Sequence, residues 1–249
     1  MNYPPIPASL DDRTALPPPA SECGEAMVPL SAFSPRITVY PAYYHRGYAG
    51  AQTEAYLRKG AAERLALAAE QLPAGYRLVV LDGWRSHEVQ DSLYEGFRQS
   101  LIAQGWTDED AIARELGKFV AKPTTDLEKP SPHLSGGAVD LTIAGPDGWL
   151  AMGTDFDDFS ELAATRSFEE IREPAEKEIE IRDNRRLLYH AMIQAGFTNY
   201  AQEWWHYEYG TRSWARQTRQ LPFYGGILSV QDEKKQLNDV NICNILKIN

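Results

Sequence analysis

Two histidines and one aspartate, His133, Asp140 and His206, form a ligand set of the type that a catalytic zinc ion uses. Zinc accepts nitrogen and oxygen donors in a tetrahedral shell, and a hydrolytic site leaves the fourth position for water. With one ionised aspartate in the shell, the site keeps about one net positive charge, which draws the pKa of the bound water toward ~7. Glu203 is then a spare carboxylate. The sequence therefore predicts one Zn²⁺ ion held by three side chains.

The residues between His133 and Asp140 favour this assignment. The segment 135–137, Ser-Gly-Gly, allows the backbone to turn and to approach other segments closely. In residues 138–143, apolar and polar side chains alternate as in a strand. Asp140 can therefore point into a site while its neighbours fill a core.

Glu203 and His206 are three residues apart, a spacing that puts side chains on one face of a helix but on opposite faces of a regular strand. The aromatic residues around them favour a strand. We therefore expect Glu203 at a bend or irregular start of that strand and His206 within it, so that both reach one cavity.

Each of these residues alone has a plainer structural interpretation. A histidine beside tryptophans is usually a core residue with a satisfied hydrogen bond, and an aspartate after two glycines is usually a turn residue. The chain holds only five histidines, however, and two of them fall in the two stretches that also hold well-placed acids and many aromatics. Taken together, these residues favour a metal site.

Five motifs together resemble one known family. They are Ser-x-His-x-x-Gly-x-Ala-x-Asp at 131–140, Glu-Trp-Trp-His at 203–206, Leu-Asp-Gly-Trp-Arg at 81–85, Met-Gly-Thr-Asp-Phe-Asp at 152–157 and Arg-Arg-Leu-Leu-Tyr at 185–189. In this combination the chain resembles the zinc D-alanyl-D-alanine dipeptidases, the VanX-like branch of peptidase family M15 in the D,D-peptidase superfamily. The likeness spans roughly residues 40–225.

The resemblance implies a fold, a substrate and several residue roles. The fold would be α+β, Hedgehog/D,D-peptidase-like, and the substrate a small D,D-dipeptide, D-Ala-D-Ala. Asp157 would meet the free ammonium of the dipeptide, with Ser131 assisting. This role agrees with the charges of the two groups, because a carboxylate binds the cationic end of a substrate.

Arg85 is expected where a strand over 76–81 gives way to a helix that Ser86 can cap. A guanidinium there could stabilise the negative charge that develops on a scissile carbonyl oxygen, or it could form a surface salt bridge. The matched motif favours the first role. The predicted mechanism is amide hydrolysis by a metal-bound water, with Glu203 taking the proton as general base and passing it to the leaving amine.

Composition limits the partners. The 249 residues are 43% hydrophobic and 24% charged, as in an ordinary globular protein. The formal net charge of -10 argues against binding to nucleic acid or to an anionic membrane, since both need clustered Lys and Arg. No apolar run approaches the ~18–20 residues that a membrane span needs. We expect a small-molecule substrate and no nucleic-acid or membrane partner; the oligomeric state is left open.

The N-terminus and the cysteines bear on location. The first residues lack the basic region and apolar core of a signal peptide, so we expect a cytoplasmic protein, or a periplasmic one if a leader was removed. Cys23 and Cys243 lie near opposite ends of the chain, outside the predicted site. They suit a reducing compartment and offer no metal-binding cluster.

The spacing of the apolar residues and the Gly and Pro residues that end the elements predict one α+β domain with a central, mostly antiparallel sheet flanked by helices. Helices are expected over 53–72, after 85, from 107 to about 120, and over 184–195, and the strand at 138–143 should pair with 149–152. The acid-rich segment 168–180 should be mobile and solvated, either a lid or a connector.

Three regions are expected along the chain: a proline-rich arm over 1–39, a zinc D,D-dipeptidase domain over 40–230 and a peripheral tail over 231–249. The arm should run extended over the surface without regular elements. The tyrosines that follow it either line a substrate mouth or anchor the arm; they are Tyr40, Tyr43, Tyr44 and Tyr48, with Arg46 among them.

Two alternatives to the dipeptidase remain. One is a D,D- or L,D-carboxypeptidase or murein endopeptidase of the same superfamily, which an open groove would favour. The other is a non-catalytic zinc-binding module, against which the presence of both Glu203 and Arg85 argues, because a structural site usually closes its shell with a fourth protein ligand.

Overall fold

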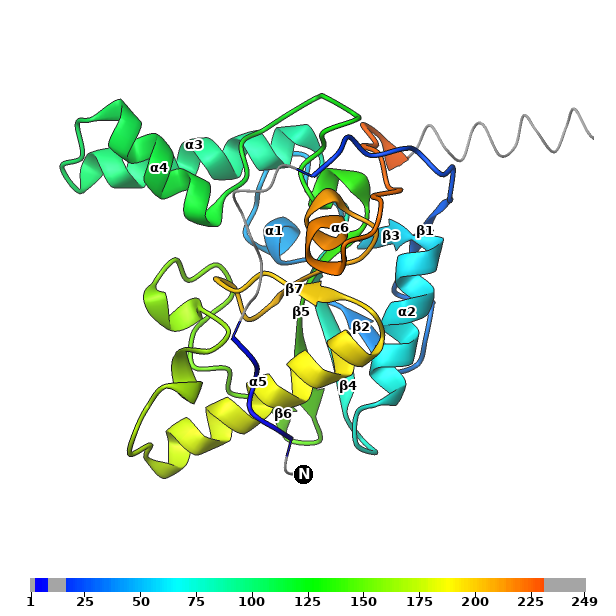
Figure 1. Cartoon of the computed structure of the whole chain (residues 1–249), viewed down its shortest axis with the longest axis vertical. Helices are drawn as coiled ribbons and strands as arrows, with labels where there is room; N and C mark the ends of the chain where they lie inside the picture. The colour runs from blue at the N-terminus through cyan, green and yellow to red at the C-terminus, as the bar shows by residue number, and fades with distance from the viewer. Residues whose placement is uncertain (1–2, 9–16, 231–249) are drawn as a thin grey trace, which may run out of the picture.

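A six-stranded sheet with the strand order β2-β4-β5-β8-β7 lies at the centre of the molecule, and β6 pairs with β5 beside this path (Figure 1). The computed structural model describes residues 3–8 and 17–230. The strands of this sheet are β2 (Ile37–Val39), β4 (Arg77–Asp82), β5 (Ala138–Gly145), β6 (Gly148–Trp149), β7 (Thr198–Asn199) and β8 (His206–Glu208). Only β2 and β4 are parallel; the other pairs are antiparallel. The mostly antiparallel α+β fold is therefore confirmed.

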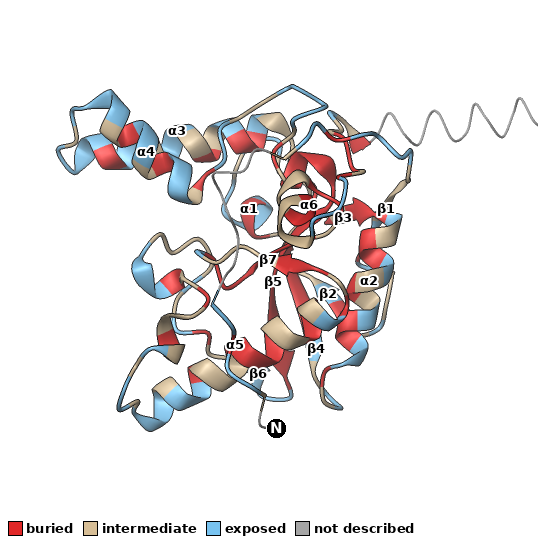
Figure 2. Ribbon diagram, in the orientation of Figure 1, coloured by how far each residue is buried: buried red, intermediate tan, exposed pale blue. Residues whose placement is uncertain are grey.

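The central strand β5 is buried along its whole length, and its side chains alternate between two interiors (Figure 2). Val139, Leu141 and Ile143 belong to the main hydrophobic core. Asp140 and Thr142 are therefore on the opposite face, because successive side chains of a strand point to opposite sides. The alternation predicted from the sequence is confirmed, and it separates the core from the polar side of the sheet.

Two helices cover the core face of the sheet. These are α2 (Lys59–Glu70) and α5 (Glu176–Gln194), and α5 crosses in front of the strands in Figure 1. Their buried side chains, such as Leu65 and Leu188, join the strand residues in one cluster. Complete burial of each such side chain stabilises the fold by about 1.5–3 kcal/mol.

The remaining helices are α1 (Ala42–His45), α3 (His87–Ala103), α4 (Glu109–Phe119) and α6 (Arg212–Thr218). Ser86 caps α3 by accepting a hydrogen bond from the backbone N–H of Val89, and Asp108 caps α4 in the same way. The α3–α4 hairpin projects from the body of the molecule and is largely exposed (Figures 1 and 2). None of the helices within the described ranges is long and apolar enough to cross a membrane.

Two predicted helix boundaries are wrong. The helix expected from residue 53 begins at Lys59, because Tyr56–Arg58 forms β3 and pairs with β1 (Met27–Pro29) in a separate two-stranded sheet. The helix expected from residue 184 begins at Glu176. The first error arises from a strand partner far away in the sequence, whereas the start of α5 has a local contact, in which the Glu178 side chain accepts a hydrogen bond from the Ala175 N–H.

Two expectations about irregular segments also fail, the second of them in part. The proline-rich arm contains β1 and β2, and β2 pairs with β4 in the central sheet. The segment 168–180 is solvated only in part: most of 170–180 is exposed, but Phe168 is buried, Glu169 forms an ion pair with Arg186, and α5 begins at Glu176. The boundaries of the arm and of the main domain stay predictions, and the predicted tail over 231–249 lies outside the described residues.

Candidate active site

One cavity of about 300 Å³ on the polar side of the sheet brings together the seven side chains that were predicted to bind metal, catalyse the reaction or bind substrate. Its lining includes Arg85, Ser131, His133, Asp140, Asp157, Glu203 and His206. Residues 117–121 at the end of α4 and part of α6 also line the cavity. The convergence of these residues is therefore a feature of the fold, and their roles remain predictions.

The sheet register and a tight turn position the three proposed metal ligands. Asp140 of β5 and His206 of β8 are directly opposite each other, which places their side chains together on one face. His133 lies in a short 3₁₀ turn that ends at Gly136, whose φ of 71° suits glycine. A side chain at Gly137 would collide with the carbonyl oxygen of Tyr209. The two glycines therefore serve the turn and the close approach that the sequence predicted.

The facing atoms of these three residues have the spacing of ligands around one zinc ion. His133 Nε2 lies 3.2 Å from His206 Nδ1 and 3.3 Å from Asp140 Oδ2, and His206 Nδ1 lies 2.9 Å from Asp140 Oδ1. Two donors bonded to a tetrahedral zinc at about 2.0–2.1 Å lie roughly 3.3 Å apart. The donor types and their spacing therefore fit zinc.

Burial and hydrogen bonding shift the pKa values of two of these ligands in opposite directions. Burial alone would raise the pKa of Asp140, but the charges and hydrogen bonds of His133 and His206 outweigh it and lower that pKa. Burial alone would lower the pKa of His206, but hydrogen bonds with Asp140 and Glu208 raise it well above its ordinary value. The aspartate is thus ionised, as a metal ligand must be.

Glu203 lies in a turn immediately before β8, so the predicted irregular start of this strand is confirmed. Its side chain is buried in the cavity, and Oε2 lies 3.8 Å from His206 Nδ1. Burial raises the pKa of Glu203 to about 8. The carboxylate therefore stands beside the ligand cluster and on the same edge of the His206 ring.

Arg85 is held rigidly at the end of β4. Its Nε donates to Asp82 Oδ2 at 2.8 Å, Nη1 donates to Gln90 Oε1 at 3.0 Å, and Nη2 donates to Asp140 Oδ2 at 3.1 Å. The guanidinium also lies over the ring of Tyr43, 4.7 Å from its centroid. The alternative of a surface salt bridge is excluded, because this guanidinium is buried against the ligand cluster.

Asp157 occupies the side of the cavity nearest α1. Its carboxylate accepts a hydrogen bond from Tyr43 at 3.2 Å and forms an ion pair with Arg46 at 2.5 Å. Burial raises the pKa of Asp157 to about 6, against the lowering effect of Arg85 and Arg46. Of the tyrosines after the arm, Tyr43 thus lines the cavity, whereas Tyr40 and Tyr44 are exposed.

Sequence reasoning missed three residues around the ligands. Gln90 is buried in α3 and links Arg85 to the carbonyl oxygen of Ala121. Asp82 belongs to the Leu-Asp-Gly-Trp-Arg motif, but the motif did not predict its contact with Arg85. Glu208 carried a usable signal, because it follows His206 by two residues in a strand and must share its face.

Comparison with known proteins gives a consistent result. The peptidase M15 family, described as D-ala-D-ala dipeptidase, matches residues 47–223. A D-alanyl-D-alanine dipeptidase from Synechocystis sp. is 26% identical over 234 residues, which cover 84% of this chain and 94% of the relative.

Solved structures are more distant. The vancomycin resistance D,D-pentapeptidase VanY in complex with Zn(II) shares 19% identity at a TM-score of 0.40, covering 68% of this chain and 83% of its own. The LdcB LD-carboxypeptidase shares 21% identity at a TM-score of 0.31, covering 67% of this chain and 66% of its own.

Proposed function

Because this chain belongs to the peptidase M15 family, we propose that it is a zinc-dependent dipeptidase that hydrolyses D-Ala-D-Ala. The observation that carries the proposal is the convergence of three metal-ligand atoms and a separate buried glutamate in one cavity. The relative that is named for this dipeptide matches nearly its whole length, which supports the choice of substrate.

His133, Asp140 and His206 would hold the ion through Nε2, a carboxylate oxygen and Nδ1 respectively. When bound, zinc supplies a Lewis acid that polarises the amide carbonyl and lowers the pKa of a coordinated water. The three residues leave a coordination position for that water, as hydrolytic zinc sites do.

Glu203 acts as the proton carrier in this proposal. It lies beside the ligand cluster without being one of the three ligands. Burial raises its pKa to about 8, but a cation held by the cluster would favour the ionised form, so the carboxylate could then take a proton from the attacking water. It then delivers this proton to the nitrogen of the leaving D-alanine. The cavity shields the transfer from bulk solvent, since Glu203 is buried.

Arg85 stabilises the charge that develops on the carbonyl oxygen of the scissile amide. Its hydrogen bonds to Asp82 and Gln90 hold the guanidinium in place before substrate binds, so little reorganisation is needed during the reaction. The bond to Asp140 places it beside the ligands.

Asp157 and Ser131 recognise the amino end of the dipeptide. A buried carboxylate is a strong partner for an ammonium group, and Ser131 lines the same cavity. The ion pair between Arg46 and Asp157 lies at the edge of this subsite. Substrate binding therefore requires the ammonium to share or replace the contact made by Arg46.

The test is hydrolysis by the zinc-loaded protein, followed by the amino groups that it releases, of D-Ala-D-Ala, of L-Ala-L-Ala and of longer peptides that end in D-Ala-D-Ala. The proposal predicts turnover of the D,D-dipeptide above the other two. Turnover of only the longer peptides would instead indicate a carboxypeptidase or endopeptidase. Bound zinc without hydrolysis of any substrate would indicate a binding module.

A further inference from the structure

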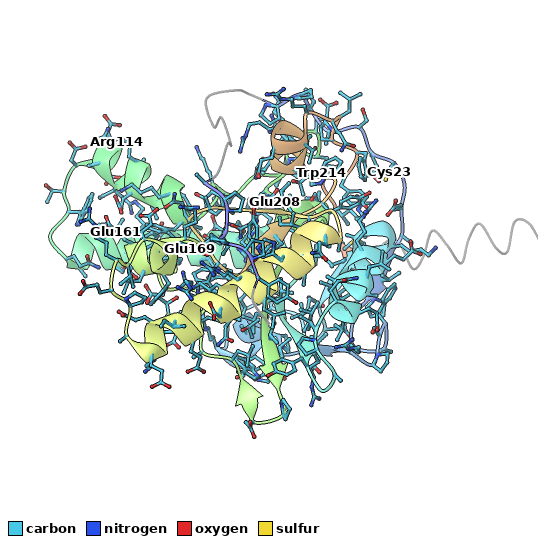
Figure 3. All side chains as sticks on the ribbon, turned by 60° about the horizontal axis from the view of Figure 1, so that its bottom comes forward. Cys23, Arg114, Glu161, Glu169, Glu208 and Trp214 are labelled. Atoms are coloured by element: carbon cyan, nitrogen blue, oxygen red, sulfur yellow. The ribbon has the colours of Figure 1, made fainter. Side chains whose placement is uncertain are left out.

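Glu208 is a buried carboxylate in the site that the mechanism above does not use. The residue is 4% exposed, and it lines the same cavity as the ligand cluster. Figure 3 shows it within the body of the molecule, whereas Arg114 and Glu161 lie at the periphery. Burying a charged carboxylate is costly unless its oxygens are hydrogen-bonded, so the contacts of Glu208 indicate its role.

Both oxygens of this carboxylate are engaged. Oε1 lies 3.1 Å from Nε2 of His206, and Oε2 accepts a hydrogen bond from the hydroxyl of Thr211. That hydroxyl also accepts a hydrogen bond from the backbone N–H of Trp214 at 3.1 Å, so its single proton is directed to Glu208. The carboxylate is therefore fixed in position by the start of α6.

The contact at Nε2 determines which nitrogen of His206 is available to bind a metal. A carboxylate only accepts hydrogen bonds, so Nε2 donates to Glu208 and, in the absence of a metal, Nδ1 donates to Asp140. Nδ1 is the atom that faces Asp140 and His133. A metal that replaced the Nδ1 proton would therefore meet the Nδ1 lone pair, while the Nε2 proton stays bound to Glu208.

His133 is arranged in the complementary way. Its Nδ1–H donates to the backbone carbonyl oxygen of Gly83 at 2.7 Å, which leaves the lone pair on Nε2. Each histidine is therefore oriented through the nitrogen that faces away from the cluster. Metal-ligating histidines commonly donate their second N–H to a carboxylate or a carbonyl in this manner.

We propose that Glu208 is a positioning residue that holds His206 with its proton on Nε2 and its Nδ1 lone pair directed at the metal position. The inference rests on the proposed metal site. It also separates two glutamates that flank one ring: Glu203 is near the Nδ1 edge, where the chemistry takes place, and Glu208 is on the Nε2 edge, where it orients the ring.

The test compares zinc affinity, measured by competition with a chelator, in the wild type and in Glu208→Ala, Glu208→Gln and Glu203→Gln. Loss of an outer partner of a metal-binding histidine typically weakens metal affinity by about 10–100-fold, and we expect this for Glu208→Ala. Glu208→Gln keeps an acceptor of the same shape and should recover part of the loss. Glu203→Gln should bind zinc like the wild type.

A second readout follows the His206 ring directly. Nitrogen-15 spectra of histidine-labelled protein should show His206 protonated at Nε2 in the zinc-loaded wild type. In zinc-loaded Glu208→Ala, the exchange of that proton should be faster and its signal shifted. A purely structural role of Glu208 would change the unfolding midpoint without changing this signal.

A pair of threonine variants covers the case in which Glu208→Ala fails to fold. Thr211→Val removes the donor to Glu208 and should weaken zinc binding, whereas Thr211→Ser keeps the hydroxyl and should not. Thr198→Val is the matched control, because Thr198 pairs with Glu208 across the sheet but its hydroxyl donates to the backbone carbonyl of Glu208.

The outcomes are distinguishable. Weaker zinc binding in Glu208→Ala together with the altered His206 signal supports the inference. Wild-type zinc affinity and an unchanged His206 signal in Glu208→Ala would overturn it and leave the proposed function intact. A wild-type protein that binds no zinc would overturn both.

Discussion

Glu203 Oε2 lies 3.8 Å from Nδ1 of His206, on the ring edge that faces His133 and Asp140. This distance is too long for a hydrogen bond, so the histidine does not hold the glutamate. The relationship arises because Glu203 lies in the turn and His206 in the strand that follows it. A carboxylate beside the ligands and outside their shell is what a general base requires.

Replacing Glu203 by Gln should reduce kcat for D-Ala-D-Ala by roughly 10²–10⁴-fold, because the amide cannot carry the proton from water to the leaving amine. The zinc content should stay at the wild-type level, since Glu203 is not one of the three ligands. Steady-state kinetics together with metal analysis measures both. Substantial activity in this variant would show that another group moves the proton.

Removing the metal should lower thermal stability. Several carboxylates surround the cluster, so a divalent cation relieves repulsion in the folded state. A ligand at about 100 times its Kd stabilises a protein by about 2.7 kcal/mol, and chelation should remove a stabilisation of this size.

Thermal unfolding with a chelator, then with added zinc, measures this effect. Magnesium is the control, because it prefers six oxygen ligands and should not restore the midpoint. An unfolding midpoint that changes neither with chelator nor with added zinc would contradict the proposed site.

Substrate binding should depend on pH through Asp157. Burial raises the pKa of this carboxyl to about 6, so it is ionised above that pH and protonated below it. An ionised carboxylate binds an ammonium group, and KM for D-Ala-D-Ala should therefore rise as pH falls through about 6. Asp157→Asn should have a high KM without this dependence. A KM that is constant from pH 5 to 7 in the wild type would argue against ammonium recognition by Asp157.

The Asp157 carboxyl should affect the free energy of unfolding in the opposite direction: a rise in pH strengthens substrate binding but weakens the contribution of this group to stability. Its folded pKa lies above the ordinary aspartate value of 3.8, so the native state binds more protons between pH 4 and 6. Its contribution to stability is complete below the unfolded pKa and is lost as pH rises through about 6. Asp157→Asn should therefore flatten this part of the stability profile.

Arg185 should be important for stability and for the position of Asp157. Its buried guanidinium donates to the carbonyl oxygens of Met152, Leu162 and Ala164 at 2.7–2.8 Å, which ties down the loop that carries Asp157. Arg185→Met leaves these carbonyls unpaired, at a cost of about 3 kcal/mol. KM should rise as well.

Denaturant unfolding and kinetics check these two effects. Arg98, whose ion pairs with Glu95 and Glu109 lie on the projecting hairpin, provides the control: Arg98→Met should leave the unfolding midpoint nearly unchanged. An Arg185→Met protein that unfolds at the wild-type midpoint would show that the hydrogen bonds of Arg185 to these carbonyl oxygens are not needed for stability.

The sequence predicted which residues converge in one cavity better than it predicted the bounds of the elements around them. Metal-ligand chemistry is local to a few residue types, so His133, Asp140, His206 and Glu203 could be identified from their motifs, and the bend before His206 followed from a spacing of three. The geometry of Arg85 could not be predicted, because it depends on Gln90 in the next helix and on Asp140 in another strand.

Two of the errors have the same physical cause. Leu57 continues the apolar spacing of α2, yet Tyr56–Arg58 is a strand because β1, almost thirty residues earlier, pairs with it. Glu169 belongs to an acid-rich run that favours solvent, yet Arg186 neutralises it from the surface of α5. Local patterns do not contain such distant partners.

The most direct test is anomalous diffraction at the zinc absorption edge from a crystal of the zinc-loaded protein. We predict a single anomalous peak within about 2.0–2.3 Å of His133 Nε2, His206 Nδ1 and an oxygen of Asp140. A peak bonded to His206 through Nε2, or the absence of a peak among these three residues, would contradict the proposed metal centre.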